Sequence, residues 1–109
     1  MARRKSLGGT PPQQGSVRES VLMQAVSLTC GDRDAVYGPP AVNLACAAEL
    51  IEVYQRYRDM TGRSTNSAHD ISMFNVLQKV ARIATGELKE DNYIDGAAYF
   101  AIAYEVEAE

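Results

Sequence analysis

The sequence contains four segments in which apolar residues recur every three or four positions, and residues that favour helix starts or stops bound each segment. Ser16 and Glu19 have the capping-box spacing of a helix start, and Gly31, Gly62 and Gly86 are suited to helix ends. No stretch alternates as a strand would. The pattern predicts an all-α fold, an antiparallel four-helix bundle or a closely related packing. The predicted helices run over 17–30, 40–61, 67–85 and 91–107.

The apolar fraction of 46% and the charged fraction of 23% are ordinary for a globular protein, and 109 residues suffice for one small domain. We expect this domain to span residues 16–109. Trp is absent and Phe is scarce, so smaller side chains and Tyr must fill the interior. Helices that pack through Ala bury little area, and a monomer would then be marginally stable. We therefore expect a homo-oligomer. The first helix can supply a buried stripe from Val17, Val21, Met23, Ala25 and Leu28.

Residues 1–15 are basic and rich in Gly, Pro and Gln, which predicts a disordered arm. Three of the basic residues, Arg3, Arg4 and Lys5, lie in this arm, so the remaining chain is more acidic than the net charge of −3 suggests. An acidic body makes nucleic acid an unlikely partner, although the arm could touch it weakly.

Cys30 and Cys46 do not have the spacing of a metal site, and we expect reduced thiols. No apolar run approaches the roughly 18 residues of a membrane span, and no signal-peptide core follows the basic start. These patterns predict a cytoplasmic protein without a membrane partner. The segment 31–40 is dense in charged and turn-forming residues and is expected to be an ordered loop.

Two pairs of carboxylates have the spacing of neighbours on one helix face. Asp91 and Asp95 lie four apart, and Glu49 and Glu52 lie three apart on another predicted helix. Carboxylates that converge from facing helices of a bundle can hold Mg²⁺. The alternatives are that Asp91 caps its helix and that the glutamates lie on a solvated face.

Lys79 and Arg82 lie three apart on the third predicted helix and could bind phosphate, pair with the acidic residues or be solvated. Tyr37 and Tyr99 could stack on a base, as could Tyr93, although aromatic residues at helical spacing are more often core residues. His69 precedes Asp70 without a nucleophile or metal ligand nearby in the pattern, and we do not expect it to be catalytic.

Three blocks, Gly31-Asp32-Arg33-Asp34-Ala35-Val36-Tyr37-Gly38-Pro39-Pro40-Ala41-Val42-Asn43, Lys79-Val80-Ala81-Arg82 and Asp91-Asn92-Tyr93-Ile94-Asp95-Gly96-Ala97-Ala98-Tyr99, resemble a small phage-encoded domain family of uncharacterised function. That family in turn resembles the all-α nucleoside triphosphate pyrophosphatases, the MazG-like superfamily. The resemblance covers about residues 17–105.

This resemblance implies an all-α oligomer in which Mg²⁺, held by carboxylates of two helices, positions a nucleoside triphosphate for attack by water. Glu49 and Glu52 match the first Glu-x-x-Glu pair of those enzymes. Asp91 and Asp95 depart from the later Glu-x-x-Asp pair by one residue. The block 31–43 has no obvious counterpart in the enzymes, so its polar and aromatic residues could serve a ligand specific to the phage-like family. These residues are Asp32, Arg33, Tyr37 and Asn43.

Three functions follow as hypotheses. The first is a Mg²⁺-dependent nucleotide pyrophosphohydrolase that acts during phage infection, with Lys79 and Arg82 on the phosphates. The second is a non-catalytic protein that binds and sequesters a nucleotide, which the irregular spacing of Asp91 and Asp95 favours. The third is a structural adaptor whose charged residues are solvated.

Overall fold

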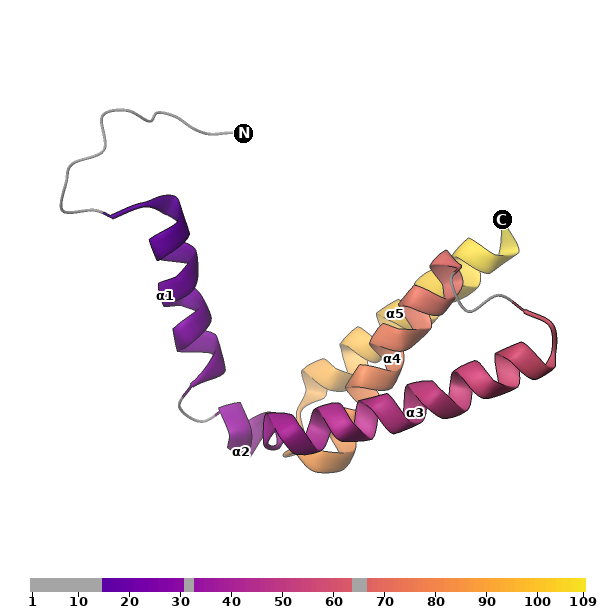
Figure 1. Ribbon diagram of the computed structural model, residues 1–109, viewed down its shortest axis with the longest axis horizontal. Helices are drawn as coiled ribbons and strands as arrows, with labels where there is room; N and C mark the ends of the chain where they lie inside the picture. Colours follow the sequence, from indigo (N-terminus) through magenta and orange to yellow (C-terminus); the bar gives the residue numbers. More distant parts are fainter. Residues whose placement is uncertain (1–14, 31–32, 64–66) are drawn as a thin grey trace. The chain divides into compact units, whose positions relative to one another are not determined.

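The computed structural model describes residues 15–30, 33–63 and 67–109, and within these ranges it contains five α-helices and no strand (Figure 1). The prediction of an all-helical fold is confirmed. The four long helices begin and end within a few residues of their predicted bounds, and the short α2 is an addition within the predicted loop 31–40. The helices are α1 Val17–Thr29, α2 Arg33–Tyr37, α3 Pro40–Met60, α4 Ala68–Thr85 and α5 Glu90–Ala108.

The chain divides into two compact units, Met1–Gly31 and Asp32–Glu109. The domain expected from the sequence began at residue 16, whereas α1 belongs to the first unit and α2 to α5 belong to the second. The predicted arm 1–15 lies outside the described residues, except for Gly15.

Helix α1 begins as the capping pattern predicts, because the Ser16 hydroxyl accepts a hydrogen bond from the Glu19 amide at 3.1 Å. None of its residues is buried. Within the described part of the first unit nothing covers the expected stripe, and its burial stays a prediction. This part of the unit contains no second element against which the stripe could pack. The stripe residues, all exposed, are Val17, Val21, Met23, Ala25 and Leu28.

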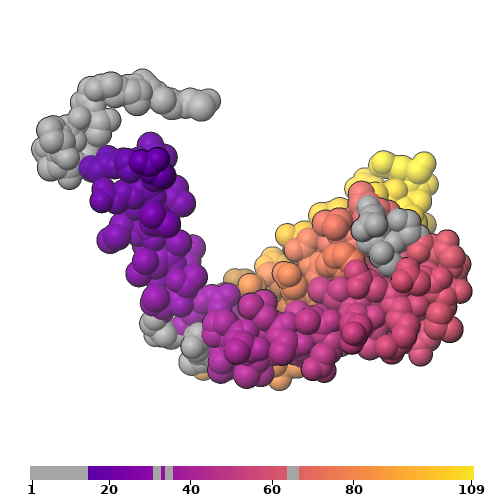
Figure 2. All heavy atoms as spheres, viewed as in Figure 1, coloured from indigo at the N-terminus to yellow at the C-terminus, as the bar shows by residue number. Residues whose placement is uncertain are grey.

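In the second unit, α4 packs extensively against both α3 and α5, and the chain reverses direction between successive long helices (Figure 1). Figure 2 shows one face of this unit, which is covered mainly by α3. The Pro at the first position of α3 and the Ser67 cap of α4 agree with the sequence signals for helix starts. Asp91 does not cap α5, since Lys89 occupies the N-cap and Asp91 lies in the first turn.

The buried apolar residues are small, which lets the three long helices approach closely but buries little apolar area. Polar contacts add to this core, and one of them links two helices, because the Ser72 hydroxyl donates to the Tyr99 carbonyl at 2.8 Å. An edge-to-face contact between Tyr54 and Phe74, with ring centroids 6.1 Å apart, joins α3 to α4. The fully buried apolar residues are Ala47, Val76, Ala81 and Ala103.

Large apolar side chains remain exposed on several helices of the described chain, including the C-terminal α5. None of the described helices combines the length and the apolar character that crossing a lipid bilayer requires.

Candidate functional site

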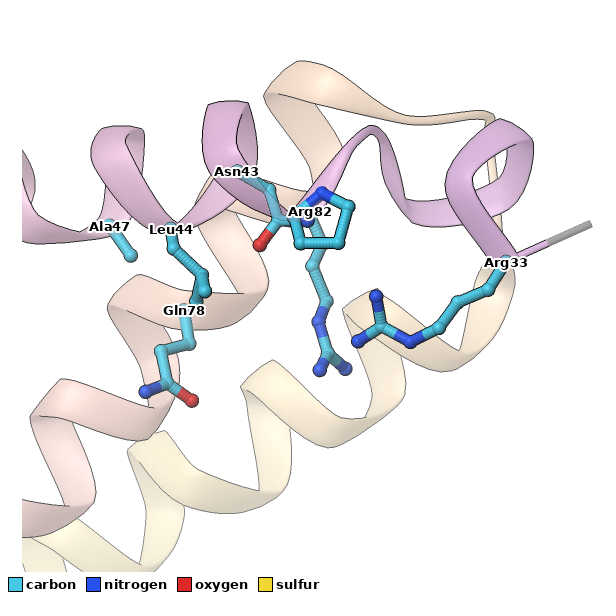
Figure 3. Close-up of a pocket in the computed structure, with 7 residues that line it drawn as sticks. Arg33, Asn43, Leu44, Ala47, Gln78 and Arg82 are labelled. Atoms are coloured by element: carbon cyan, nitrogen blue, oxygen red, sulfur yellow. The ribbon is translucent and has the colours of Figure 1, made fainter. Parts of the chain in front are cut away.

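A pocket lies where α2, the start of α3 and the last turns of α4 meet (Figure 3). Its volume is about 50 Å³. This is several times the space that one buried water needs, so the pocket can hold a group the size of a phosphate but not a whole nucleoside. The lining residues are Arg33, Pro40, Asn43, Leu44, Ala47, Gln78 and Arg82.

Close backbone packing fixes α2 against the end of α4. Gly38 has a φ of +84°, and a Cβ there would lie 2.6 Å from the Thr85 carbonyl oxygen, so this turn favours glycine on both counts. The Thr85 hydroxyl donates to the Tyr37 carbonyl at 3.2 Å, and the Glu87 amide donates to the Val36 carbonyl at 2.9 Å. These contacts hold Tyr37 and the rest of α2 beside Arg82.

Asn43 completes the corner between α2 and α3. Its side chain is buried, and the amide nitrogen donates to the carbonyl oxygens of Tyr37, Gly38 and Pro39 at 3.2 to 3.4 Å. The structure thus gives Asn43 a structural task at the wall of the pocket. A contact with ligand, which the sequence predicted, remains a prediction.

Two guanidinium groups approach the same aromatic ring at the open side of the pocket. The Cζ atoms of Arg33 and Arg82 lie 5.2 and 4.9 Å from the centre of the Tyr37 ring. Figure 3 shows these two arginines, from α2 and α4, with their ends turned toward each other. Among the described side chains, which do not include those of Asp32 and Asp34, no carboxylate oxygen lies within 4.0 Å of either group. The ring offsets part of the repulsion, and an anion between the guanidinium groups would offset more of it.

Gln78 adds a neutral hydrogen-bonding side chain to the same pocket, one helical turn before Arg82. Sequence reasoning missed Gln78, although its position four residues before a predicted phosphate ligand was a usable signal. The apolar wall, formed by Leu44 and Ala47, could not be assigned to a pocket before the packing of α3 on α4 was known.

Lys79 does not join Arg82 in this pocket. Its ammonium group lies 3.3 Å from an Asp95 carboxylate oxygen, and its side chain lines a separate groove between α4 and α5. Lys79 and Arg82 lie three residues apart, about 60° around α4, and Lys79 lies on the side that faces α5 whereas Arg82 lies on the side that faces α2. The structure therefore brings Lys79 together with Asp95, as one of the predicted alternatives had it.

The four predicted metal ligands lie on two helices that both pack on α4. Glu49 and Glu52 are exposed on α3, Asp91 is exposed on α5, and the half-exposed Asp95 forms the ion pair with Lys79. Among the described residues of one chain, no group of three His, Cys, Asp or Glu side chains is placed to hold a metal ion. A single copy therefore does not bring these carboxylates into one site.

Two other predicted ligand-binding residues lie elsewhere or are not described. Asp32 lies outside the described residues. Tyr99 is partly buried on α5, where its carbonyl oxygen accepts the hydrogen bond from Ser72. It is not among the residues that line the pocket of Arg33 and Arg82.

A buried polar cluster lies at the other end of α4. One Asp70 carboxylate oxygen is 2.8 Å from an Arg58 guanidinium nitrogen, 2.5 Å from the Tyr54 hydroxyl and 3.0 Å from His69 Nδ1. Asp70 is 0% exposed. Glu107 of α5 lies 3.7 Å from the Arg58 guanidinium group. The Asp70 carboxylate joins α3 to α4, and the Glu107 carboxylate adds α5 to the cluster through Arg58.

The pKa values in this cluster follow from burial and pairing. Burial opposes ionisation of Asp70, but hydrogen bonds from Tyr54, His69 and Arg58 outweigh it and hold the pKa of the carboxyl below its ordinary value. Burial and the neighbouring carboxylate raise the pKa of Tyr54 to about 12. Burial tends to lower the pKa of Arg58, and the contact with Asp70 more than reverses this. The arrangement stabilises a neutral tyrosine and a charged Arg58–Asp70 pair.

One comparison with known proteins gave a match. The model of a family described as a domain of unknown function, DUF6378, matches residues 20–107. The chain belongs to this family. The DUF6378 match includes every residue that lines the pocket of Arg33 and Arg82, and also the cluster around Asp70. Comparisons of the DUF6378 chain with curated proteins and with solved structures gave no match.

Proposed function

We propose that this DUF6378 protein binds a phosphorylated small molecule, with a nucleotide as the expected class, and that one phosphate lies between Arg33 and Arg82. The observation that carries the proposal is the approach of two guanidinium groups to the Tyr37 ring, with no carboxylate of the described side chains within 4.0 Å of either. Guanidinium groups form paired hydrogen bonds with phosphate oxygens.

The surroundings support a specific site over general attraction of anions. The chain carries a net charge of −3, so its overall charge does not attract a phosphorylated ligand and binding depends on local groups. The pocket volume of about 50 Å³ fits a phosphate, and Gln78 supplies an amide at its wall. The remainder of a nucleotide would extend beyond the pocket.

Mg²⁺-dependent hydrolysis, the activity that the MazG-like resemblance implies, is a second candidate. The observation in its favour is that Glu49 and Glu52 lie exposed one turn apart. Among the described residues, no Lys, Arg or His side-chain nitrogen lies within 4.0 Å of their carboxylates. One copy does not fit a complete metal site, because Asp91 and Asp95 lie on a helix beyond α4. We therefore derive no hydrolytic step. A role in phage infection and a cytoplasmic location also remain predictions.

The test compares Arg82→Gln with Arg56→Gln. Arg56 is a matched control, because its guanidinium group lies 5.5 Å from the ring of Tyr57 but outside the pocket. We expect Arg82→Gln to weaken nucleotide binding roughly 10- to 100-fold, the size of a lost charge-assisted hydrogen bond. Arg56→Gln should bind as the wild type does. Isothermal titration with a panel of nucleoside mono-, di- and triphosphates in EDTA measures this.

Each result of the titration has a defined meaning. Equal weakening by both substitutions would show general electrostatic attraction and contradict the site. If no nucleotide binds or raises the melting temperature, the structural-adaptor hypothesis is favoured. Release of pyrophosphate that requires Mg²⁺ would favour the hydrolase, whereas recovery of intact ligand after binding in EDTA supports a binding protein.

A further inference from the structure

The exposed side of α5 carries apolar residues at a regular spacing. Tyr93, Ala97, Phe100 and Tyr104 lie four, three and four residues apart, which is the spacing of an apolar seam between paired helices. Tyr93, Tyr104 and Phe100 are exposed by 50%, 75% and 55% respectively. We call these four residues the α5 seam. A seam of this kind on a globular protein indicates a surface that another helix covers.

A hollow lies directly beside the α5 seam. It has a volume of about 250 Å³ and lies between α4 and α5. Gly96 and Ala97 line the hollow on the α5 side, where their small size leaves space next to Phe100 and Tyr93. The apolar residues of its α4 side are Val76, Val80 and Ile83. The same surface therefore presents protruding aromatic rings and a hollow of aromatic size.

One buried polar group in this hollow lacks a partner. Asn92 is 2% exposed and lines the hollow, and its amide nitrogen has no hydrogen-bond partner among the described residues. Leaving a buried donor unpaired costs about 1–3 kcal/mol. An aromatic ring of a partner would fill the apolar space of this hollow.

We propose that the α5 seam and its hollow form the interface with a second copy of this chain. A surface that contains both the protruding rings and the hollow that can receive them is self-complementary, as a two-fold interface requires. A tyrosine of each copy would enter the hollow of the other.

The exposed area agrees with what a stable dimer needs. The large apolar residues of the seam and its borders, including Val80 and Ile94, expose on the order of 700 Å² per copy, close to the ~800 Å² that each partner contributes to a standard interface. The buried apolar core of one copy consists of three alanines and one valine among the described residues. Association would add the apolar burial that this core does not provide.

The first experiment measures the mass of the full-length chain by sedimentation equilibrium. The wild type should be a dimer at micromolar concentration. Phe100→Glu should raise the dissociation constant at least 100-fold, because it would place two charges in an apolar seam. Ile102→Glu is the matched control, since Ile102 lies on the same helix with 45% exposure but points away from the α5 seam. Ile102→Glu should remain a dimer.

A second variant keeps the test decisive if Phe100→Glu does not fold. The chain contains no Trp, so Tyr104→Trp introduces a single indole in the α5 seam. Its emission maximum should shift to shorter wavelength as the protein concentration rises through the dissociation constant. Tyr57→Trp, on an exposed position of α3, should show no such shift. Three results would each overturn the proposal. The first is a monomeric wild type, and the second is a dimer broken by Ile102→Glu but not by Phe100→Glu. The third is an emission spectrum of Tyr104→Trp that does not change with concentration.

Discussion

Asp70 lies at the centre of the buried polar cluster of the second unit. Its carboxylate contacts Tyr54, Arg58 and His69, and its backbone amide donates to the Ser67 cap of α4 at 3.2 Å. In the sequence, Asp70 stood out only as the residue that follows His69 near the start of a predicted helix. Its partners on α3, Arg58 and Tyr54, are twelve and sixteen residues away in the sequence, so their convergence depends on how α3 packs against α4.

Replacing Asp70 by Asn should be strongly destabilising. The change removes the carboxylate that lies 2.8 Å from the buried Arg58, and the cost of breaking such a pair is about 3 kcal/mol or more. Chemical denaturation measures the free energy of unfolding. Asp59→Asn, on an exposed position of α3, is the control and should change it by less than about 0.5 kcal/mol. Similar values for both variants would contradict a buried ionic role for Asp70.

The raised pKa of Tyr54 predicts a loss of stability at high pH. Between pH 10 and about 12 the unfolded chain has lost the Tyr54 proton while the folded chain retains it. The folded state then binds more protons, so the free energy of unfolding falls as the pH rises through this window. Tyr54→Phe should flatten this dependence when unfolding is followed by circular dichroism. Tyr57→Phe, one turn further on the same helix, should keep the wild-type slope, and a slope unchanged by Tyr54→Phe would refute the assignment.

At the scale of single elements, the short α2 is the feature that forms the candidate site. The sequence predicted an ordered segment there because of its Gly, Pro and charged residues, but a five-residue helix gives too little periodicity to recognise. Its position depends on two glycines, Gly38 and Gly86, that bring the backbone of this segment against the end of α4.

Gly86→Ala should therefore disturb the pocket. A Cβ at this position would lie 2.3 Å from the Val36 carbonyl oxygen, so α2 must shift and carry Tyr37 and Arg33 with it. We expect a loss of about 1–3 kcal/mol in stability and weaker phosphate binding. Gly62→Ala is the control. Its φ of +77° disfavours alanine, but a Cβ added there would meet no heavy atom of a neighbouring group within 4 Å. Titration of both variants checks this, and unchanged nucleotide affinity in Gly86→Ala would show that α2 does not position the site.

The long helices illustrate what periodicity and capping residues can predict. Ser16 caps the helix that it was expected to cap, Ser67 caps α4, and Gly62 follows the end of α3 in a left-handed conformation. These signals are local, involving residues within four positions of one another. The position of Lys79 relative to Arg82 was less predictable, because both charges could have faced one ligand if α4 had packed on a single neighbour.

At the scale of the whole molecule, the all-helical class follows from the sequence, whereas the division into two units does not. Apolar spacing in α1 resembles that of the other long helices, so the sequence predicted that α1 would be one of the four helices of the bundle. In the structure none of the residues of α1 is buried, and the helix belongs to the first unit. Apolar spacing shows that a helix has a face to cover but does not identify what covers it. The same argument applies to the α5 seam, whose partner we propose to be a second copy.

The central position of α4 constrains its register more than that of its neighbours. Within the five residues 78–82, the helix directs Gln78 and Arg82 to the pocket, Lys79 and Val80 to the hollow, and Ala81 to the core. Inserting one residue ahead of this stretch would rotate every later side chain by about 100° and exchange these three environments at once. We therefore expect a change of length within α4 to be far more damaging than most single substitutions in it.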